Sequence, residues 1–192
     1  MKRAFRISIS FLGVAVAALA FAGPETESFG PAQVAADFIR AAAKADIAFL
    51  PAGELKSSFK SGDLAGLLEF PTDEVVVSQL TGSQIRQALE RSIALYPSPN
   101  KGFLQLSGIV VTFSKTGNPN KRIVSATLAG ADLDDAKKYR VAMPGLLAGG
   151  GLGYFTIWGK AQIIETLANQ NLETVLKGKS GTDPQARWRP AP

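Results

Sequence analysis

Residues 31–50 show two hydrophobic patterns, the first typical of a helix and the second of a buried strand. Residues 31–43 are rich in alanine, and their larger apolar side chains recur at helical spacing. That apolar face consists of Val34, Phe38 and Ile39. Pro31 suits the first turn of a helix, because its missing N–H would have no partner there. The sequence therefore predicts a helix over 31–43, followed by a short buried strand over 47–50.

A second helix is predicted after a longer strand. Asp63 is typical of an N-cap and indicates a short helix that ends near Leu68. The β-branched run 74–80 predicts a strand. Thr81 and Gln84 have the spacing of a capping box, which marks the start of an amphipathic helix. The apolar face of that helix carries Ile85, Leu89 and Ile93.

The pattern becomes strand-like beyond residue 97. Residues 104–113 alternate, 117–120 read as a turn, and 123–128 and 139–143 predict further strands. A last helical stretch is predicted over 161–176. Helices and strands are thus mixed without internal repeats, so we expect a single α+β domain of mixed helices and sheet.

The N-terminus has a different character from the rest of the chain. Three basic residues precede the apolar run ISISFLGVAVAALAFA, which closes with small residues around Ala22. This order is typical of a secretory signal peptide over 1–22, cleaved near Ala22. The alternative is a membrane anchor, but the run is shorter than the ~20 residues that a spanning helix needs. We expect a periplasmic or secreted protein that is not bound to a membrane after cleavage.

The remaining boundaries follow from composition. We interpret 23–30 as a linker, 31–177 as the folded domain, and the polar segment 178–192 as a flexible tail. The formal net charge of the whole chain is +5, and three of its basic residues lie in the proposed signal peptide. The rest of the chain has no basic stripe with interleaved aromatic residues, so a nucleic acid is not an expected partner.

The chain contains neither histidine nor cysteine. It therefore cannot form a Ser-His-Asp triad, a cysteine nucleophile, or a zinc site with imidazole or thiolate ligands. Its adjacent acidic residues stand in polar, turn-like surroundings that favour solvated carboxylates over a catalytic pair. These are Asp73, Glu74, Asp132, Asp134 and Asp135. We assign no catalytic residue, no metal site and no cofactor.

Two glycine-containing segments invite a phosphate-binding interpretation, and both depart from the motifs. The residues 178–180 resemble the end of a P-loop, but Glu173 stands where its first glycine is needed. The run GGGLGY has Tyr154 where a GxGxxG pattern starting at Gly149 requires glycine. The glycines of GLLAGGGLGYF need another explanation.

Five segments together resemble the C-terminal domain of the 5'-nucleotidase and UDP-sugar hydrolase family. They are ADIAFLPAGELK, LLEFPTDEVVVSQLTGSQIRQALE, FLQLSGIVVTF, LAGADLDDAKKYRVAM and LLAGGGLGY, in this order over about residues 31–158. In that family an N-terminal metallophosphoesterase domain holds two metal ions through histidine, aspartate and asparagine, while the C-terminal domain holds the base and sugar of the substrate. The resemblance thus implies a substrate-binding domain that occurs alone, without the metallophosphoesterase domain.

The resemblance also implies where a substrate would lie. The arginine of the family segment N-A-G-G-I-R falls on Lys56, with Glu54 added nearby, and the asparagine of P-F-G-N falls on Thr72. Lys56 keeps the charge but loses the planar bidentate fork. The aromatic residue that opens F-L-Q is kept as Phe103 and is a candidate for stacking on a base. A packed core position is an equal alternative for Phe103.

The glycine run resembles the substrate-facing loop of the family. Backbone freedom is kept at Gly149, Gly150 and Gly151, while the aromatic and the aspartate of F-L-A-x-G-G-D-G are replaced by Leu146 and Leu152. The candidate substrate-binding residues are therefore Phe103, Lys56, Thr72, Gly149, Gly150 and Gly151. The two leucines make the expected pocket more apolar.

Three functions remain open at this point. The first is a non-catalytic nucleotide-binding subunit that assists a separately encoded metallophosphoesterase in nucleotide catabolism. The second is an orphan periplasmic module for another small molecule, which Leu146, Leu152 and Glu54 favour. The third is a hydrolase in its own right, which the lack of histidine makes the weakest of the three. The resemblance is to a hydrolase family, and we do not expect catalysis by this chain alone.

Overall fold

The computed structural model describes residues 23–56, 58–59 and 61–192. The predicted signal peptide lies outside these residues. Within them, no helix has both the length and the apolar character that crossing a membrane requires.

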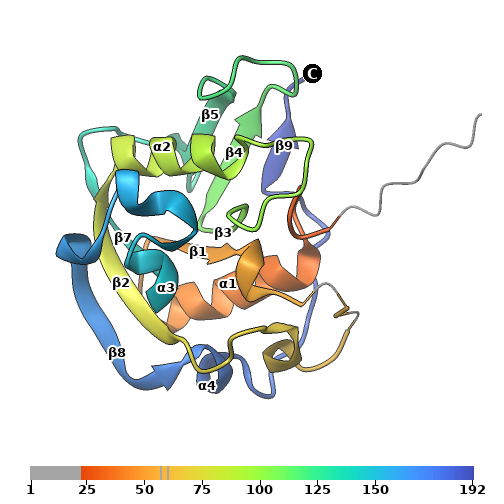
Figure 1. The fold of residues 1–192 in the computed structure, drawn as a ribbon, viewed down its shortest axis with the longest axis vertical. Helices are drawn as coiled ribbons and strands as arrows, with labels where there is room; N and C mark the ends of the chain where they lie inside the picture. Colours follow the sequence, from red (N-terminus) through yellow and green to blue (C-terminus); the bar gives the residue numbers. More distant parts are fainter. Residues whose placement is uncertain (1–22, 57, 60) are drawn as a thin grey trace, which may run out of the picture.

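The described chain forms two sheets with short helices around them (Figure 1). The α-helices are α1 (Gly30–Ala42), α2 (Gly82–Ser92), α3 (Gly145–Ala148) and α4 (Leu172–Leu176). The 3-10 helices are η1 (Ala52–Glu54), η2 (Leu64–Leu67), η3 (Gly151–Thr156) and η4 (Lys160–Gln162). The strands are β1 (Ile47–Pro51), β2 (Glu74–Thr81), β3 (Leu104–Ser107), β4 (Ile109–Phe113), β5 (Ile123–Leu128), β6 (Ala131–Asp132), β7 (Lys138–Pro144), β8 (Ile163–Asn171) and β9 (Trp188–Pro190). The predicted α+β fold is confirmed.

The larger sheet has the strand order β3-β1-β7-β2-β8, and the smaller has the order β6-β5-β4-β9. In the larger sheet β1 and β7 are parallel, whereas β2 runs antiparallel to β7 with Val75 opposite Pro144. The ends of β1 and β7 therefore lie at the same edge of the sheet as the start of β2. The loops at that edge come from three distant parts of the sequence.

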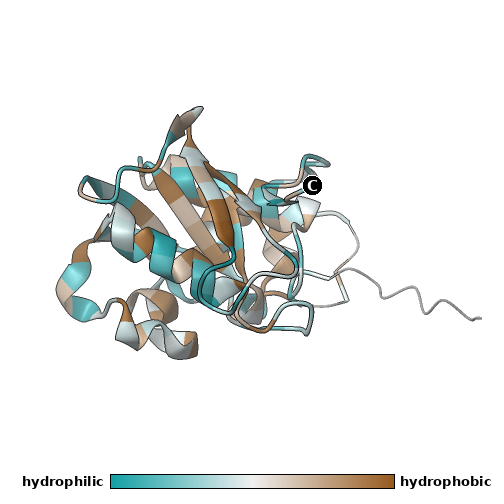
Figure 2. Ribbon diagram, turned by 90° about the horizontal axis from the view of Figure 1, so that it is seen from above, coloured by the Kyte–Doolittle hydropathy of each residue, from teal (hydrophilic) through white to brown (hydrophobic). Residues whose placement is uncertain are grey.

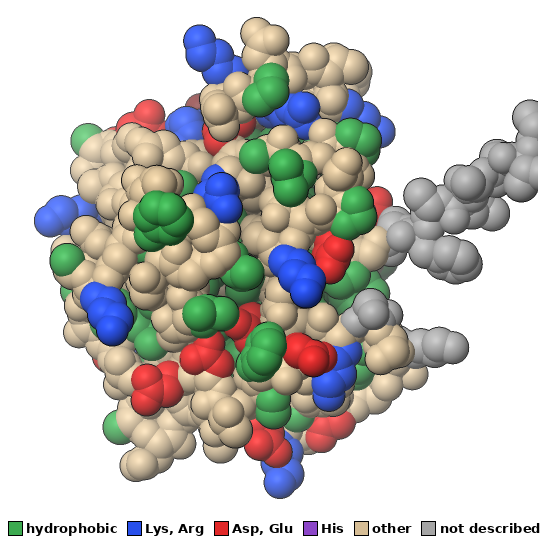
Figure 3. Space-filling model, viewed as in Figure 1, with side chains coloured by type: hydrophobic (Ala, Val, Ile, Leu, Met, Phe, Trp, Pro, Cys, Tyr) green, Lys and Arg blue, Asp and Glu red, His purple; other side chains and the backbone are tan. Residues whose placement is uncertain are grey.

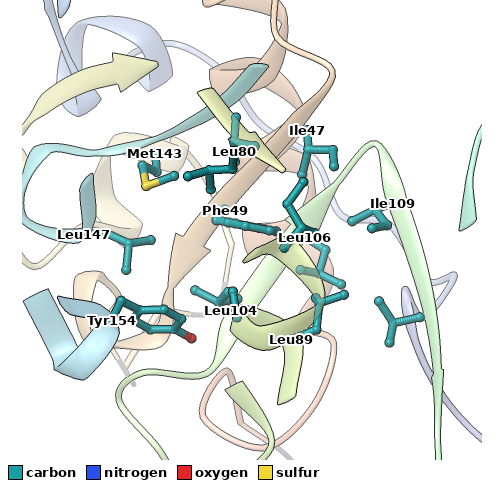
Figure 4. Packing of buried hydrophobic residues seen from close by; sticks show 14 of the residues in the cluster. Ile47, Phe49, Leu80, Leu89, Leu104, Leu106, Ile109, Met143, Leu147 and Tyr154 are labelled. Atoms are coloured by element: carbon teal, nitrogen blue, oxygen red, sulfur yellow. The ribbon is translucent and has the colours of Figure 1, made fainter. Parts of the chain in front are cut away.

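Both faces of the larger sheet are covered. One buried cluster includes Ala36 and Ile39 of α1 together with Val75 and Val77 of β2. The other includes Leu89 of α2 and continues into the smaller sheet. Figure 2 shows hydrophobic residues concentrated in the central strands, and Figure 4 shows side chains of the second cluster meeting between strands and helices. Burial on both faces explains why β1 is apolar throughout.

Local signals placed several elements correctly. α1 occupies the predicted helix with Pro31 in its first turn, and the Asp63 side chain accepts a hydrogen bond from the N–H of Ala65. The capping box of α2 is present, because the Thr81 hydroxyl accepts from Gln84 N and Gln84 Oε1 accepts from Thr81 N. These elements are specified by residues only a few positions apart.

The predicted strand over 104–113 is two strands in different sheets. Gly108 separates β3 from β4 and has a φ of 79°. A side chain at Gly108 would collide with the carbonyl oxygen of Asp46. The glycine therefore lets the chain turn sharply from the larger sheet into the smaller one.

The helix predicted over 161–176 is wrong for most of its length. Ile163–Asn171 form strand β8, and only Leu172–Leu176 are helical. β8 pairs with β2 along the edge of the larger sheet, with Ile163 opposite Ser78 and Asn171 opposite Glu74. Long-range pairing with an open strand edge outweighs a helical spacing of apolar residues.

The flexible tail predicted over 178–192 is also wrong. Residues 188–190 form β9, and Trp188 is buried with its indole N–H donating to the carbonyl of Leu104 at 2.7 Å. The Arg187 guanidinium is paired with Asp37 at 2.6 Å and with Asp183 at 2.9 Å. The polar composition of this segment was misleading, because the residues that hold Arg187 and Trp188 in place lie far away in the sequence.

The linker predicted over 23–30 packs against the domain. The buried Gln105 side chain donates to the carbonyls of Pro24 at 2.9 Å and Glu27 at 2.8 Å. α1 already begins at Gly30. The ordered domain thus includes residues on both sides of the predicted 31–177 boundaries.

Candidate functional site

Three segments converge at the edge where β1 and β7 end and β2 begins. They are residues 52–56 after β1, residues 70–73 before β2, and residues 145–155 after β7. We refer to these three segments together as the loop edge. In the same view as Figure 1, Figure 3 shows acidic and hydrophobic side chains side by side in the lower half of the molecule, where the chain leads into β2 and α4.

Asp73 joins two of these segments. Its Oδ2 accepts a hydrogen bond from Leu146 N at 3.1 Å, and its Oδ1 accepts from Glu74 N at 2.9 Å. Its carbonyl oxygen also accepts from Leu172 N at 2.9 Å. The carboxylate therefore fixes the first turn of α3 relative to the start of β2, although Asp73 was predicted to be an ordinary solvated acid.

The glycine run is folded tightly on itself. Gly150 has a φ of 89° and Gly153 a φ of 82°. A Cβ atom on Gly151 would lie 2.6 Å from the Leu146 carbonyl oxygen, and one on Gly150 would lie 2.8 Å from Phe155 Cα. These glycines are therefore required by close packing within the loop. Gly149 is exposed, with a φ of −73°.

Hydrogen bonds from Arg91, Tyr154 and Trp158 hold the segment 145–155 in place. Arg91 Nη2 donates to the Leu152 carbonyl at 2.6 Å, and the Tyr154 hydroxyl donates to the Gly102 carbonyl at 2.7 Å. The indole N–H of Trp158 donates to the carbonyl of Leu147 at 2.8 Å. Figure 4 shows Tyr154 and Leu147 within the packed cluster. Burial raises the pKa of Tyr154, so its hydroxyl remains a neutral donor.

The candidate binding residues do not all come together. Lys56 and Thr72 are exposed on two segments of the loop edge. The Phe103 backbone lies beside that edge, because its carbonyl accepts from Ala52 N at 2.8 Å. The Phe103 side chain, however, is only 2% exposed and its ring centroid lies 5.2 Å from that of Trp188. The structure therefore favours the core alternative for Phe103 over base stacking.

Two other aromatic residues are open to solvent at or near this edge. Phe70 is 53% exposed and Phe155 is 73% exposed, while Leu146 between them in sequence is 53% exposed. Sequence analysis overlooked Phe70, which stands in the turn EFPTD directly before β2. A large aromatic residue among turn-forming polar residues was the available signal, because such a residue has little local reason to be buried.

Glu54 is the unusual ionisable group of the loop edge. It is 1% exposed, and its Oε2 has no hydrogen-bond partner among the described residues. Burial, and second the Asp73 carboxylate, raise the pKa of Glu54 to about 7. The Glu54 carboxyl group therefore keeps its proton to a higher pH than an ordinary glutamate side chain does.

The loop edge exposes apolar side chains together with a few polar ones. Within residues 23–56, 58–59 and 61–192, no group of three or more acidic residues is placed to hold a metal ion. The edge offers exposed apolar surface from Phe70 and Leu146, one cation at Lys56, and the Thr72 hydroxyl. Exposed apolar side chains with a few polar groups nearby suit a flat, largely uncharged ligand portion.

Comparison with known proteins finds similarity to nucleotidases. Residues 19–159 match the family model described as 5'-nucleotidase, C-terminal domain. A 5'-nucleotidase-related protein of Glossina morsitans morsitans is 37% identical over 142 residues, which are 67% of this chain and 25% of that protein. Snake venom 5'-nucleotidase of Naja atra is 35% identical over 89 residues, which are 42% of this chain and 17% of that protein. The chain thus spans a quarter or less of the length of these relatives.

Solved structures show the same fold. A 5'-nucleotidase precursor from Thermus thermophilus matches with a TM-score of 0.68 and 22% identity, covering 86% of this chain and 36% of that chain. The NAD nucleotidase of Haemophilus influenzae matches with a TM-score of 0.63 and 19% identity, covering 83% of this chain and 33% of that chain.

Proposed function

This chain belongs to the 5'-nucleotidase C-terminal domain family, and from that membership we propose that it is a non-catalytic, substrate-binding subunit in nucleotide catabolism. In this proposal the loop edge holds the nucleoside part of a nucleotide. A separately encoded metallophosphoesterase supplies the metal ions and hydrolyses the phosphate ester.

The observation that carries the proposal is the pair of exposed apolar side chains on neighbouring segments. Phe70 precedes β2, Leu146 lies in the segment after β7, and Asp73 joins the two segments through its hydrogen bond with Leu146 N. A nucleobase can stack on an aromatic face irrespective of the polar groups on its edge. Phe70 therefore takes the role that the sequence suggested for Phe103.

The charges at this edge support a site in which this chain binds the nucleoside part of the nucleotide and the partner binds the phosphate. The segment 145–159 carries no charged side chain, and the Asp73 carboxylate lies beside it. Lys56 is the cation of the loop edge. A phosphate group placed deep in this site would meet the Asp73 carboxylate and the buried acid Glu54, so the uncharged part of the nucleotide fits better. The phosphate would lie toward the partner, whose metal ligands would include the histidines that this chain lacks.

A second candidate function has its own support. Leu146 and Leu152 replace an aromatic and an acidic residue of the resembling family loop, and the buried Glu54 adds an acid. These changes favour an orphan binding module for another apolar, neutral small molecule. The two functions differ in whether nucleosides bind better than other flat aromatic compounds.

Calorimetric titration of the purified protein with adenosine, AMP and a series of uncharged benzamides tests both functions. The first predicts that adenosine binds, that AMP gains little over adenosine, and that adding a candidate metallophosphoesterase produces metal-dependent AMP hydrolysis faster than the phosphoesterase alone. Binding of the benzamides without adenosine would support the second. Metal-dependent hydrolysis by this chain alone, tracking it through a second purification, would overturn both.

We also propose that the protein is exported and that residues 1–22 are removed on the way, which places it in the periplasm or outside the cell. The support is the order of basic, apolar and small residues in this segment.

A further inference from the structure

A cavity apart from the loop edge lies where the two ends of the described chain meet the smaller sheet. Its volume is about 340 Å³, and its wall comes from residues 26–28, from the end of β4 and the turn that follows, and from residues between 184 and 190. In Figure 1 the first described residues, drawn in red, lie beside β9, to which Ser28 is hydrogen-bonded. None of the described residues of the loop edge lines this cavity. It is therefore a second candidate site, of a size that suits a small molecule.

Three aromatic residues form the apolar side of this cavity. Tyr96 lies edge-to-face with Phe113, with ring centroids 5.2 Å apart and planes at 77°, and Phe113 meets Trp188 in the same way at 6.0 Å and 82°. Phe113 and Trp188 are buried, and the Trp188 indole N–H donates to the carbonyl of Leu104 at 2.7 Å, so both rings are held in place. Two prolines of the C-terminal segment line the same cavity. The aromatic side is thus formed in advance for an apolar ring or branched chain.

The Ser28 hydroxyl gives this cavity a hydrogen-bond donor. Its oxygen accepts hydrogen bonds from Arg187 N at 2.9 Å and from Trp188 N at 3.0 Å. A hydroxyl oxygen has two acceptor positions and one donor hydrogen, so both acceptor positions of Ser28 are used. Its hydrogen has no acceptor among the residues that the structure describes. Ser28 can therefore only donate to a ligand, which selects an acceptor such as a carboxylate oxygen.

Two opposite charges line the same cavity. Lys115 and Glu27 are exposed, and neither forms an ion pair within the described part of the chain. The backbone of Glu27 is fixed, because its carbonyl oxygen accepts a hydrogen bond from the buried Gln105 at 2.8 Å. A ligand with only a carboxylate would leave Glu27 without a partner, and a ligand with only an amine would leave Lys115 and Ser28 without one. The charges therefore favour a ligand that carries both groups.

We propose that this cavity binds a free α-amino acid with an aromatic or branched apolar side chain, in its zwitterionic form. The carboxylate accepts from the Ser28 hydroxyl and pairs with Lys115, while the ammonium group pairs with Glu27. The apolar side chain lies against Tyr96 and its neighbouring rings. This site shares no residue with the loop edge, so it does not depend on the proposed nucleoside binding.

The test titrates the isotope-labelled protein with L-phenylalanine and follows its two tryptophan indole N–H signals by NMR. Trp188 lines the cavity, whereas Trp158 donates to the carbonyl of Leu147 in the segment after β7. The chain has no other tryptophan. We expect the Trp188 signal to move until it saturates and the Trp158 signal to stay constant. An unmoved Trp188 signal, or equal movements of the two signals, overturns the proposal.

A series of analogues tests each part of the ligand. N-acetyl-L-phenylalanine lacks the ammonium group, L-phenylalaninamide lacks the carboxylate, and L-alanine lacks the ring. Each of the first two should bind about twofold to fivefold more weakly than L-phenylalanine, which is the range of an exposed ion pair. L-alanine should bind about tenfold more weakly, because it loses the apolar contact with the rings. If the two charge analogues bind as tightly as L-phenylalanine, the ligand is not a zwitterion and the proposal is wrong.

Two variants with matched controls assign the charges. Lys115→Met should remove the preference for L-phenylalanine over its amide, and Glu27→Gln should remove the preference over the N-acetyl derivative. Lys121→Met, on the same β4–β5 connection, and Glu25→Gln, two residues before Glu27, change residues that do not line the cavity and should keep both preferences. Lys115 and Glu27 are exposed, so their variants should fold, and an unchanged Trp158 signal verifies this. Variants that behave like their controls would contradict the proposal.

Discussion

The ring of Trp188 lies against that of Phe103, with centroids 5.2 Å apart and planes inclined at 42°. Trp188 comes from β9 and Phe103 from the residue before β3, so this contact joins the two sheets. It covers the ring that the sequence offered as a stacking platform. The role of Phe103 can therefore be decided by comparing stability with affinity.

Phe103→Ala should lower the free energy of unfolding by about 3–5 kcal/mol, because it leaves a cavity in a packed core. Nucleoside affinity of the folded variant should be nearly unchanged. Denaturant unfolding and calorimetric titration of the same preparation measure the two quantities. A large loss of affinity with unchanged stability would restore Phe103 to the binding site.

Phe70→Ala should have the opposite effects: nucleoside affinity should fall, and stability should stay nearly the same. Phe70 is 53% exposed, so its removal should change the free energy of unfolding little. Loss of a stacked base should cost about 1–3 kcal/mol, or about one to two decades in nucleoside affinity. Val124→Ala removes an exposed apolar side chain from β5 and is the matched control. Equal affinities of the two variants would remove Phe70 from the site.

Arg187→Gln should destabilise the C-terminal segment. The guanidinium pairs with Asp37 and Asp183 and also donates to the Leu106 carbonyl at 2.6 Å. Asp37 and Asp183 are partly exposed and glutamine can keep one hydrogen bond, so we expect a total loss of about 2–3 kcal/mol, together with faster proteolysis near Trp188. Arg189→Gln, at an exposed position of β9, serves as the control. Identical cleavage rates in both variants would mean that the ion pairs do not hold this segment.

Stability should fall as pH rises through the range in which Glu54 ionises. The pKa of Glu54 is about 7 in the folded protein, compared with an ordinary value of 4.5, so the folded state binds more protons between these values. Unfolding free energy should therefore decrease from about pH 4.5 to about pH 7 and then level off, by about 1–3 kcal/mol after allowance for solvent screening. The measurement is the difference between the natural protein and Glu54→Gln at each pH. A difference that is constant across this range would contradict the raised pKa.

Mass spectrometry of the exported protein should find a new N-terminus at Gly23. The order of basic, apolar and small residues over 1–22 motivates this expectation. Replacing Ala20 and Ala22 by larger residues should slow processing, because signal peptidase sites require small side chains. An intact Met1 on a membrane-bound protein would favour the anchor instead.

The sequence predicted well those elements whose signals are local. The capping box of Thr81 and Gln84 and the β-branched run before it define β2 and α2 without reference to the rest of the chain. β8 was mistaken for a helix because its strand character comes from pairing with β2, which lies far away in sequence. The spacing of apolar residues within 163–171 does not show that this segment pairs with β2.

The glycine run, Lys56 and Thr72 lie at one edge of the sheet, as the ordered segments of the resemblance implied, whereas the Phe103 side chain is buried in the core. That this edge binds a substrate stays a prediction. Phe103 and Phe70 could not be told apart from sequence, because burial of an aromatic ring depends on what packs over it. For Phe103 that partner is Trp188, in a segment that composition suggested to be flexible.

The contact between β9 and the rest of the domain also bears on the order in which the protein can fold during synthesis. Ser28 Oγ accepts hydrogen bonds from Arg187 N at 2.9 Å and from Trp188 N at 3.0 Å, so an early and a late segment of the growing chain depend on each other. A nascent chain that has not yet reached Trp188 lacks the side chain that closes the core over Phe103. The core over Phe103 can therefore close only after Trp188 has been synthesised, more than eighty residues after the ring that it covers.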